Sequence, residues 1–358
     1  MKKLIFLQII IIGTFASCTF AGKNPDKEVL KAFELRMNGK VDQAQAMLET
    51  ILAKDSTNAM AHYEMARLKH YMLTGGGGTK IDDILTSINK AVTYDPENVT
   101  YAYYKAIASF LNAFMAMQTE QADVKSYVEE TCKQFEKVLS LKPDYFEASL
   151  YLVEIYGMLP KDMGGDSLKA VAYAEKLGKM NGYFGAKAEA ALAPEGADLV
   201  KFWEDLLAKD DKNPELCMEA GRAYLYKDDP VKAEEYFDKA IKSDPSKNIL
   251  LLDLARYHMY QVMQNKDLGA TELPLEKTFV EKYLNSTPEP IIPMKAYAMG
   301  LLTRVEMFFG NQAEAEKLMN EAKSLDPYFS RASGIPTLLL FDPPDQICHH
   351  YFSFFSPF

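Results

Sequence analysis

Apolar side chains recur every three to four residues along most of the chain between residues 27 and 327. This spacing places them on one face of an α-helix, and short turns rich in Pro, Gly, Asn and Asp separate stretches of helical length. No stretch of useful length alternates apolar and polar residues as a β-strand does. We therefore predict an all-α body over residues 27–327.

The N-terminus has a different pattern. Lys2 and Lys3 precede an apolar run from Leu4 to Phe15, and small residues follow this run. That order is typical of a secretory signal. The run has 12 residues, fewer than the roughly 20 that a helix needs to span a bilayer. We expect the segment to be removed and the mature chain to leave the cytoplasm.

Two cleavage sites remain open for this signal. The segment from Phe15 to Cys18 resembles the bacterial lipoprotein box, in which the Cys becomes the lipidated N-terminus, although the box usually carries Leu where this chain has Phe15. Because Cys18 directly follows the apolar run, we favour a signal peptide over residues 1–17, lipidation of Cys18 and a linker over residues 18–26. The alternative is ordinary cleavage after Ala21. The first predicts a lipoprotein that faces the periplasm, and the second a soluble periplasmic or secreted protein.

One unit of the body shows how paired helices would pack. In residues 213–245, the small residues Gly221 and Ala233 stand where two helices would meet, and Phe237 is placed to fill the space between them. Pro245 cannot continue the second helix, so it would turn the chain into the next unit. The unit is predicted to be a helix–turn–helix.

This unit resembles the tetratricopeptide repeat, a helix–turn–helix motif of 34 residues. Its consensus positions hold Gly221, Tyr224, Ala233, Phe237, Ala240 and Pro245, whereas Cys217 replaces the consensus Trp. A second good copy has Gly310, Ala315, Ala322 and Pro327, and the first copy has Gly39 and Ala44. The resemblance is specific in three units, moderate in three and weak in two.

The whole body divides into eight such units. Their expected ranges are 27–58, 59–96, 97–143, 144–182, 183–213, 214–245, 246–288 and 289–327. The resemblance implies an α-solenoid in which about eight helix pairs stack into a right-handed superhelix. It also implies a concave surface that is lined by the first helix of each pair and holds a peptide or a partner protein. The family has no intrinsic chemistry.

The segment 328–358 does not look like the polar helix that commonly closes such arrays. Five of its last eight residues are aromatic, and so apolar a segment needs to be covered. We expect an irregular tail that either packs over the edge of the last repeat, or docks onto a membrane-embedded partner or into the groove of the array.

Composition and net charge make some classes of binding partner improbable. The 358 residues include 40 Lys+Arg and 50 Asp+Glu, a net charge of −10. This balance argues against non-specific binding to nucleic acid or to anionic lipid. Contact with a membrane is therefore expected only through the N-terminal lipid anchor. Four cysteines without CxxC spacing exclude a disulfide-dense scaffold and suggest no metal site.

No group of residues has the spacing that catalysis requires. His62 and His70 are eight residues apart, which suits neither a zinc pair nor a base–nucleophile couple. The run from Cys348 to His350 lacks a second ligand cluster. The four glycines at 75–78 lack the spacing and the preceding strand of a phosphate loop. We expect no enzyme, no metal and no cofactor.

Arginines follow a less ordinary pattern. Four of the six directly follow the small or polar residue at which the first helix of a unit packs most tightly, and an aromatic residue follows four positions later. This spacing puts both side chains on one helix face, the face that lines the groove in the arrays that the chain resembles. We call these pairs rungs: Arg67/Tyr71, Arg222/Tyr226, Arg256/Tyr260 and Arg304/Phe308.

Two interpretations of the rungs compete. In the structural one, each Arg pairs with acids of neighbouring helices and a cation–π contact adds about 0.5–1 kcal/mol. In the binding one, the rungs hold a carboxylate, a phosphate or an acidic peptide. Repeat domains that clamp a peptide carboxylate use Lys and Asn on this face, whereas this chain has Arg. Three rungs in consecutive units favour binding.

These observations together predict a non-enzymatic protein-interaction scaffold of the bacterial cell envelope that binds a peptide or protein partner, an acidic one among the candidates. The alternative is a solute-binding or transporter-accessory subunit that uses the same groove for a small anionic ligand. A peptide needs an open groove several units long, whereas a small ligand needs a closed pocket of roughly 300–1,000 Å³.

Overall fold

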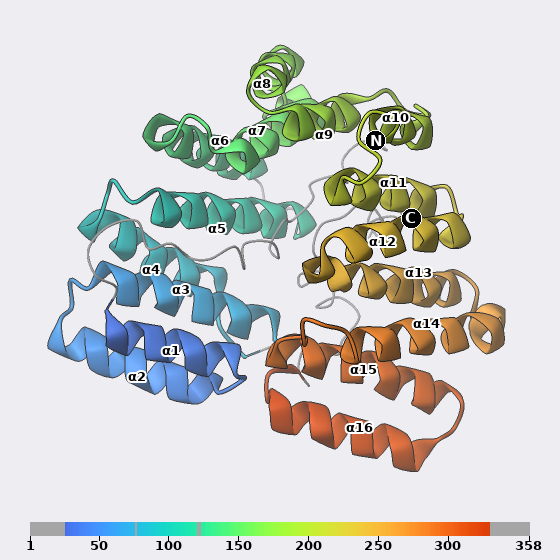
Figure 1. The fold of residues 1–358 in the computed structure, drawn as a ribbon. Helices are drawn as coiled ribbons and strands as arrows, with labels where there is room; N and C mark the ends of the chain where they lie inside the picture. The colour runs from blue at the N-terminus through green and yellow to red at the C-terminus, as the bar shows by residue number, and fades with distance from the viewer. Residues whose placement is uncertain (1–25, 76, 120–122, 330–358) are drawn as a thin grey trace. The chain divides into compact units, whose positions relative to one another are not determined.

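The computed structural model describes residues 26–75, 77–119 and 123–329. The expected signal peptide, the lipidation site Cys18 and the tail from residue 330 onward lie outside these residues. The described part contains sixteen α-helices, three short 3₁₀-helices and no strand. The prediction of an all-α stack of paired helices is thus confirmed (Figure 1).

The helices follow one another along the chain with short connections. They are α1 (Lys27–Met37), α2 (Val41–Lys54), α3 (Ala59–Thr74), α4 (Ile81–Tyr94), α5 (Val99–Gln118), α6 (Val124–Leu141), α7 (Phe146–Met158), η1 (Lys161–Met163), α8 (Ser167–Met180), α9 (Gly182–Leu192), α10 (Leu199–Leu207), α11 (Pro214–Tyr226), α12 (Pro230–Ser243), η2 (Pro245–Ile249), α13 (Leu250–Gln264), η3 (Lys266–Leu268), α14 (Gly269–Leu284), α15 (Ile292–Phe308) and α16 (Gln312–Leu325). Each of the eight expected segments contains two of the α-helices.

The chain forms two compact units. In the described residues, the first comprises 26–36 and 40–195, with helices α1 to α9, and the second comprises 37–39 and 196–329, with helices α10 to α16. The boundary after residue 195 falls inside the segment 183–213, which the sequence predicts as one repeat. Its two helices, α9 and α10, therefore lie in different units.

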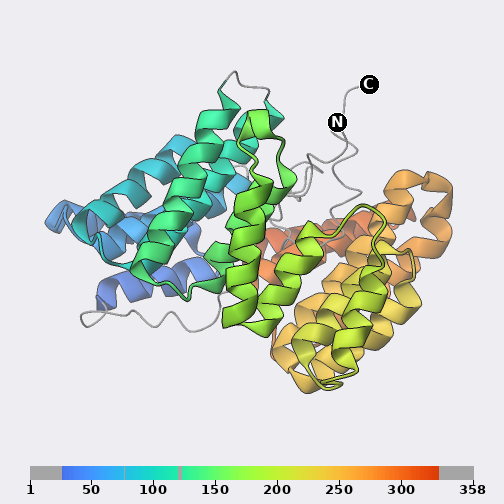
Figure 2. The ribbon, with the colours of Figure 1, turned by 90° about the horizontal axis from the view of Figure 1, so that it is seen from above.

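In the first unit, the helices pack as antiparallel neighbours along the chain (Figures 1 and 2). Helices α3 and α4, α5 and α6, and α7 and α8 form pairs, and the second helix of one pair packs on the first helix of the next. Between α3, α4 and α5 this packing buries Ile84 and Ile88 against Tyr63 and Tyr101. Helix α9 packs on both α7 and α8.

The second unit repeats this arrangement. Helices α11 and α12, α13 and α14, and α15 and α16 are its pairs, while α10 packs on α11, α12 on α13 and α14 on α15. In the pair α11–α12, a Cβ atom added to Gly221 would lie 2.4 Å from Cε1 of Phe237 and 3.2 Å from the carbonyl oxygen of Ala233. Only glycine permits this approach, so the packing predicted for this unit is confirmed. Helix α12 ends before Pro245, as predicted.

A four-residue turn links one pair to the next at three places. The turn begins with Asp, which directly follows the last helical residue in α2 and α4 and comes three residues after Leu207 of α10. It finishes with Asn, whose side chain accepts hydrogen bonds from the first backbone N–H groups of the following helix. This capping fixes where each first helix starts. The three Asp/Asn pairs are Asp55/Asn58, Asp95/Asn98 and Asp210/Asn213.

Within the first unit, a glutamate joins two neighbouring pairs. Oε1 of Glu136 on α6 accepts hydrogen bonds from the phenols of Tyr156 on α7, at 3.2 Å, and Tyr173 on α8, at 3.3 Å. The two tyrosine rings are stacked. We call this arrangement, a carboxylate of one pair held by a tyrosine from each helix of the next, a tyrosine joint.

The second unit contains its own tyrosine joint. Oε1 of Glu204 on α10 accepts from Tyr224 on α11, at 2.7 Å, and from Tyr236 on α12, at 2.9 Å. These rings are also stacked, with centroids 5.5 Å apart. The hydrogen bond to Glu204, together with burial, raises the pKa of Tyr224 to about 12. The phenol therefore stays protonated and continues to donate.

Candidate functional site

The four rungs lie on the first helices of their pairs, as the sequence predicts. Arg67 is on α3, in the first unit, whereas Arg222, Arg256 and Arg304 are on α11, α13 and α15, in the second. The four arginines differ in the carboxylates that lie beside them.

Arg222 and Arg256 belong to one buried ion-pair network. Nη1 of Arg222 is 3.7 Å from Glu219, and its Nη2 is 3.6 Å from Asp253 on α13. Nη2 of Arg256 donates to the other oxygen of Asp253. All four side chains are almost fully buried. Two guanidinium groups thus face two carboxylates, and Asp253 links α11 to α13.

Arg67 shares its carboxylate with an arginine that the rung pattern does not include. Nε of Arg36 on α1 donates to Glu64 at 2.5 Å, and Nη1 of Arg67 is 3.5 Å from the other oxygen of Glu64. Both guanidinium groups also lie over the ring of Phe33, at 5.4 and 5.5 Å from its centroid. The Arg67 guanidinium lies over Tyr63 at 5.5 Å as well.

Sequence reasoning missed these carboxylates, although the chain contains a signal for them. Glu64, Glu219 and Asp253 each stand three residues before a rung arginine, and this spacing places acid and base on one helix face. Since the acids are buried with their arginines, the geometry of these three rungs supports the structural interpretation.

Arg304 is different. Leu301 occupies the position three residues before it, and among the described residues no carboxylate lies within ion-pair distance. Arg304 acts electrostatically on Glu276 of α14, which is 0% exposed and whose carboxylate oxygens have no hydrogen-bond partner in the described part of the chain. Burial raises the pKa of Glu276 to about 8, and Arg304 counteracts this only in part. Burial of Glu276 thus favours its neutral form, and Arg304 favours its charged form.

The aromatic members of the rungs differ as well. Tyr260 is buried, and burial raises its pKa. Tyr71 is partly buried. Tyr226 is 42% exposed and Phe308 is 50% exposed. The Arg304/Phe308 rung thus combines an arginine without an ion pair among the described residues and a half-exposed aromatic ring, whose Cζ would lie 2.1 Å from a Cβ atom added to Gly269 on α14.

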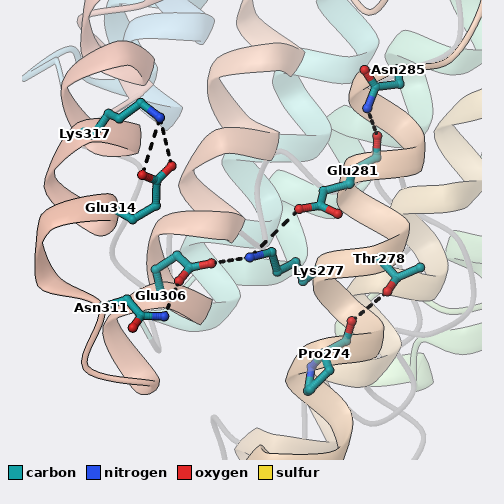
Figure 3. Close-up of polar contacts among 9 residues, drawn as sticks. All are labelled: Pro274, Lys277, Thr278, Glu281, Asn285, Glu306, Asn311, Glu314 and Lys317. Atoms are coloured by element: carbon teal, nitrogen blue, oxygen red, sulfur yellow. Dashed lines mark hydrogen bonds and ion pairs between the residues drawn. The ribbon is translucent and has the colours of Figure 1, made fainter.

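A polar cluster beside this rung holds α14 against α15. Nζ of Lys277 donates to Oε1 of Glu306 at 2.6 Å, and Nδ2 of Asn311 donates to Oε2 at 2.7 Å. Figure 3 shows Lys277 reaching from α14 to Glu306 on α15, with Glu281 on its other side. These two hydrogen bonds lower the pKa of Glu306. The cluster is therefore a bridge between the two helices, close to Arg304.

In the described part, three histidines contact neighbouring polar groups, and Cys132 and Cys217 are buried free thiols. His62 contacts the carbonyl oxygen of Ser56, His70 contacts the phenol of Tyr104, and His258 contacts Glu272. Burial and the nearby Arg36 and Arg67 lower the pKa of His70 to about 4. The described residues contain no group of three or more His, Cys, Asp or Glu that could hold a metal ion. The run from Cys348 to His350 lies outside them.

Of the helices in the described ranges, none combines the length and the apolar character needed to cross a bilayer.

Comparison with known proteins agrees with the helical pairs. The family profile of the tetratricopeptide repeat matches residues 214–247, which contain helices α11 and α12. No curated protein matches the chain.

Solved structures resemble the chain in fold. The crystal structure of MamA is 19% identical with a TM-score of 0.34, and the match covers 63% of this chain and 98% of that one. YrrB, a TPR protein with an unusual peptide-binding site, is 18% identical with a TM-score of 0.31, covering 57% and 95%. A tetratricopeptide repeat protein from Parabacteroides merdae ATCC 43184 is 13% identical with a TM-score of 0.34, covering 88% and 98%.

At these identities and TM-scores, the likenesses transfer no ligand, partner or activity to this chain. The family profile and the helical pairs agree independently on α11 and α12. Residues 214–247 therefore match the tetratricopeptide repeat, and they lie within an all-helical stack of paired helices.

Proposed function

We propose that the chain is a non-enzymatic interaction scaffold that binds a protein or peptide partner on the face formed by its first helices. Tetratricopeptide repeat proteins generally bind such partners and are generally not enzymes. The observation that carries the proposal is the repeat at 214–247 within a stack of similar helix pairs. Such stacks present an extended surface rather than an enclosed reaction centre.

The rungs divide between two roles in this proposal. Arg67, Arg222 and Arg256 brace the stack, because buried acids accompany them. Arg304 and Phe308 offer contact to a partner, because the guanidinium has no ion pair among the described residues and the ring is half exposed. A partner with a carboxylate next to an apolar side chain would match this rung.

Co-purification from the native cells, followed by binding measurements with the captured partner, tests the proposal. We expect Arg304→Gln and Phe308→Leu each to weaken binding about tenfold. The melting temperature should be unchanged for Arg304→Gln and slightly lower for Phe308→Leu, because the ring of Phe308 packs against Gly269 on α14. Tyr94→Leu is a matched control, since Tyr94 is similarly exposed on α4, a second helix. Failure of any protein to co-purify specifically, or equal binding by all three variants, would contradict the proposal.

A small anionic ligand is the second candidate, and Arg304 is the observation that favours it. A free anion needs only the guanidinium, whereas a peptide also needs the ring of Phe308. Calorimetry with di- and tricarboxylates therefore separates the two. If a carboxylate binds the parent and Phe308→Leu but not Arg304→Gln, the site holds a small anionic ligand rather than a peptide.

We also propose that the protein is exported and anchored to the cell envelope through a lipid on Cys18. The charged start, the short apolar run and the position of Cys18 support this. Mass spectrometry of the N-terminal peptide tests it. We expect an acylated Cys18 as the first residue, and an unmodified start at Gly22 would show ordinary cleavage instead.

A further inference from the structure

Two contacts fix how α14 and α15 face each other. At one of them, a Cβ atom added to Gly269 of α14 would lie 2.1 Å from Cζ of Phe308 on α15. One helical turn further along α14, Leu273 belongs to the same buried cluster as Val305, which stands one turn before Phe308. Moving forward on α14 thus means moving back on α15, and this register sets which side chains meet at the next turn.

The next turn brings an acid and a base onto facing helix surfaces. Glu276 stands three residues after Leu273 on one face of α14, and Arg304 directly precedes Val305 on α15. Glu276 is 0% exposed, and neither its oxygens nor Nε of Arg304 have a hydrogen-bond partner in the described part of the chain. Two buried polar groups of opposite character therefore lie near each other, and no ion pair joins them within the described residues.

Arg304 is the charged group that acts on Glu276. Burial raises the pKa of Glu276 to about 8, and the positive charge of Arg304 works in the opposite direction. The other charged or titratable side chains where α14 packs on α13 and α15 have contacts of their own, and those of η3 are exposed. They are His258 with Glu272, Arg256 with Asp253 and Tyr283, Lys277 with Glu281 and Glu306, and on η3 Lys266 and Asp267.

The pair has two electrostatic states, which differ in the charge that Arg304 offers to a partner. When Glu276 is ionised, its negative charge compensates Arg304 from inside the protein. When Glu276 is protonated, the guanidinium keeps its full charge for an external carboxylate. In the other rungs an acid stands three residues before the arginine, whereas Leu301 stands there in this rung. Glu276 thus takes the place of the internal acid.

We infer that Glu276 and an external carboxylate compete for Arg304, so that binding of an acidic partner at this rung is coupled to the uptake of a proton by Glu276. This inference rests on the proposed function, which assigns Arg304 to partner contact. Since the complex holds more protons than the free protein, the affinity falls as pH rises through the pKa of Glu276. The site therefore binds acidic groups more tightly at lower pH.

Carbon-13 NMR of the glutamate carboxyl groups in the full chain tests the coupling without any ligand. The signal of Glu276 is assigned by its loss in Glu276→Gln. We expect Arg304→Gln to raise the titration midpoint of Glu276 by about one pH unit, because a positive charge that favours the ionised form is removed. Lys277→Gln is the control and should leave the midpoint unchanged, since Lys277 contacts Glu281 and Glu306 instead. An unchanged midpoint in Arg304→Gln would overturn the inference and leave the proposed function standing.

N-acetyl-leucine is the probe for the linkage to binding. It offers one carboxylate beside an apolar side chain and stays ionised above pH 6, and N-acetyl-leucinamide differs from it only in lacking the charge. We expect the acid, and not the amide, to raise the midpoint of Glu276 in the parent, and neither compound to move it in Arg304→Gln. Between pH 6.5 and 9, the affinity for the acid should fall about fivefold in the parent and stay nearly constant in Glu276→Gln.

The outcomes separate this inference from the proposed function. Binding of the acid that depends on Arg304 but not on pH would overturn the inference and keep Arg304 as a contact residue. A midpoint that moves in Arg304→Gln but not with the acid would overturn the linkage and also the assignment of Arg304 to partner contact. Specific co-purification of a partner would still support the scaffold in that case.

Discussion

Glu276 shows how a single side chain can set a pH dependence. It is fully buried without a hydrogen-bond partner in the described part, and its pKa is raised to about 8. In the unfolded chain a glutamate has a pKa near 4.3. Between these values the folded state binds more protons than the unfolded state, so stability falls as pH rises.

We predict that Glu276→Gln removes this loss. From pH 4.5 to 8, the free energy of unfolding of the parent should fall relative to that of the variant, by at most about 1.4 kcal/mol per pH unit. Above pH 8 the difference should level off. Urea titrations at several pH values measure it. Glu281→Gln is the control, on an exposed side of the same helix, and parallel curves for parent and Glu276→Gln would contradict the prediction.

Gly221 is a second residue on which the packing depends. In an open helix Gly→Ala stabilises by roughly 0.5–1 kcal/mol. At Gly221, however, the added methyl group would meet the buried ring of Phe237 at 2.4 Å, so we predict that Gly221→Ala destabilises by about 1–3 kcal/mol. Gly182→Ala is the control, because nothing lies within 4 Å of its added Cβ. A Gly221→Ala protein as stable as its parent in thermal melts would show that the α11–α12 contact is looser than described.

At the scale of elements, the sequence predicts the helix pairs well, because their signals are local. Gly221, Phe237 and Pro245 act within one unit, and consensus spacing is enough to place them. The boundary after residue 195 is not predictable in this way. It depends on α9 packing on α7 and α8, where a Cβ atom added to Gly185 on α9 would lie 2.5 Å from Cα of Gly178 on α8. The consensus spacing of the repeat does not indicate this contact. The carboxylates of the rungs were missed for a related reason, since their burial follows from the neighbouring helix.

The tyrosine joints are polar contacts between successive helices and pairs. We predict that Glu204→Gln weakens the second unit by about 1–2 kcal/mol, because a charged acceptor shared by two phenols is replaced by a neutral one. Tyr224→Phe and Tyr236→Phe should show coupled, non-additive losses in a double-mutant cycle. Glu235→Gln is the control, since its ion pair with Lys232 is exposed and worth little. Additive tyrosine losses would mean that the two phenols do not share one acceptor.

At the scale of the whole molecule, the positions of buried carboxylates distinguish arginines that stabilise the stack from Arg304, which is proposed to contact a partner. Arg222→Gln/Arg256→Gln leaves Glu219 and Asp253 buried without their partners, and uncompensated buried charge is costly. We predict a melting temperature several degrees lower for this double variant. Arg304→Gln should melt like the parent. Thermal melts followed by circular dichroism measure both melting temperatures. If the double variant were as stable as the parent, Arg222 and Arg256 would not brace the stack, and the binding interpretation would apply to them.

The tyrosine joints have a consequence for how such a chain can be built. In both, the glutamate precedes its first tyrosine by 20 residues, and the two glutamates are 68 residues apart, which is twice the 34 residues of one repeat. The glutamate and its first tyrosine therefore keep the same spacing along the chain, whereas the second tyrosine follows the glutamate by 37 residues in one joint and by 32 in the other. A designed array could reuse the shared spacing to place each glutamate opposite the first tyrosine of the next pair, and would have to set the second tyrosine from the length of the connection between the two helices. The 20-residue spacing between the glutamate and its first tyrosine is thus a rule that an added repeat can follow.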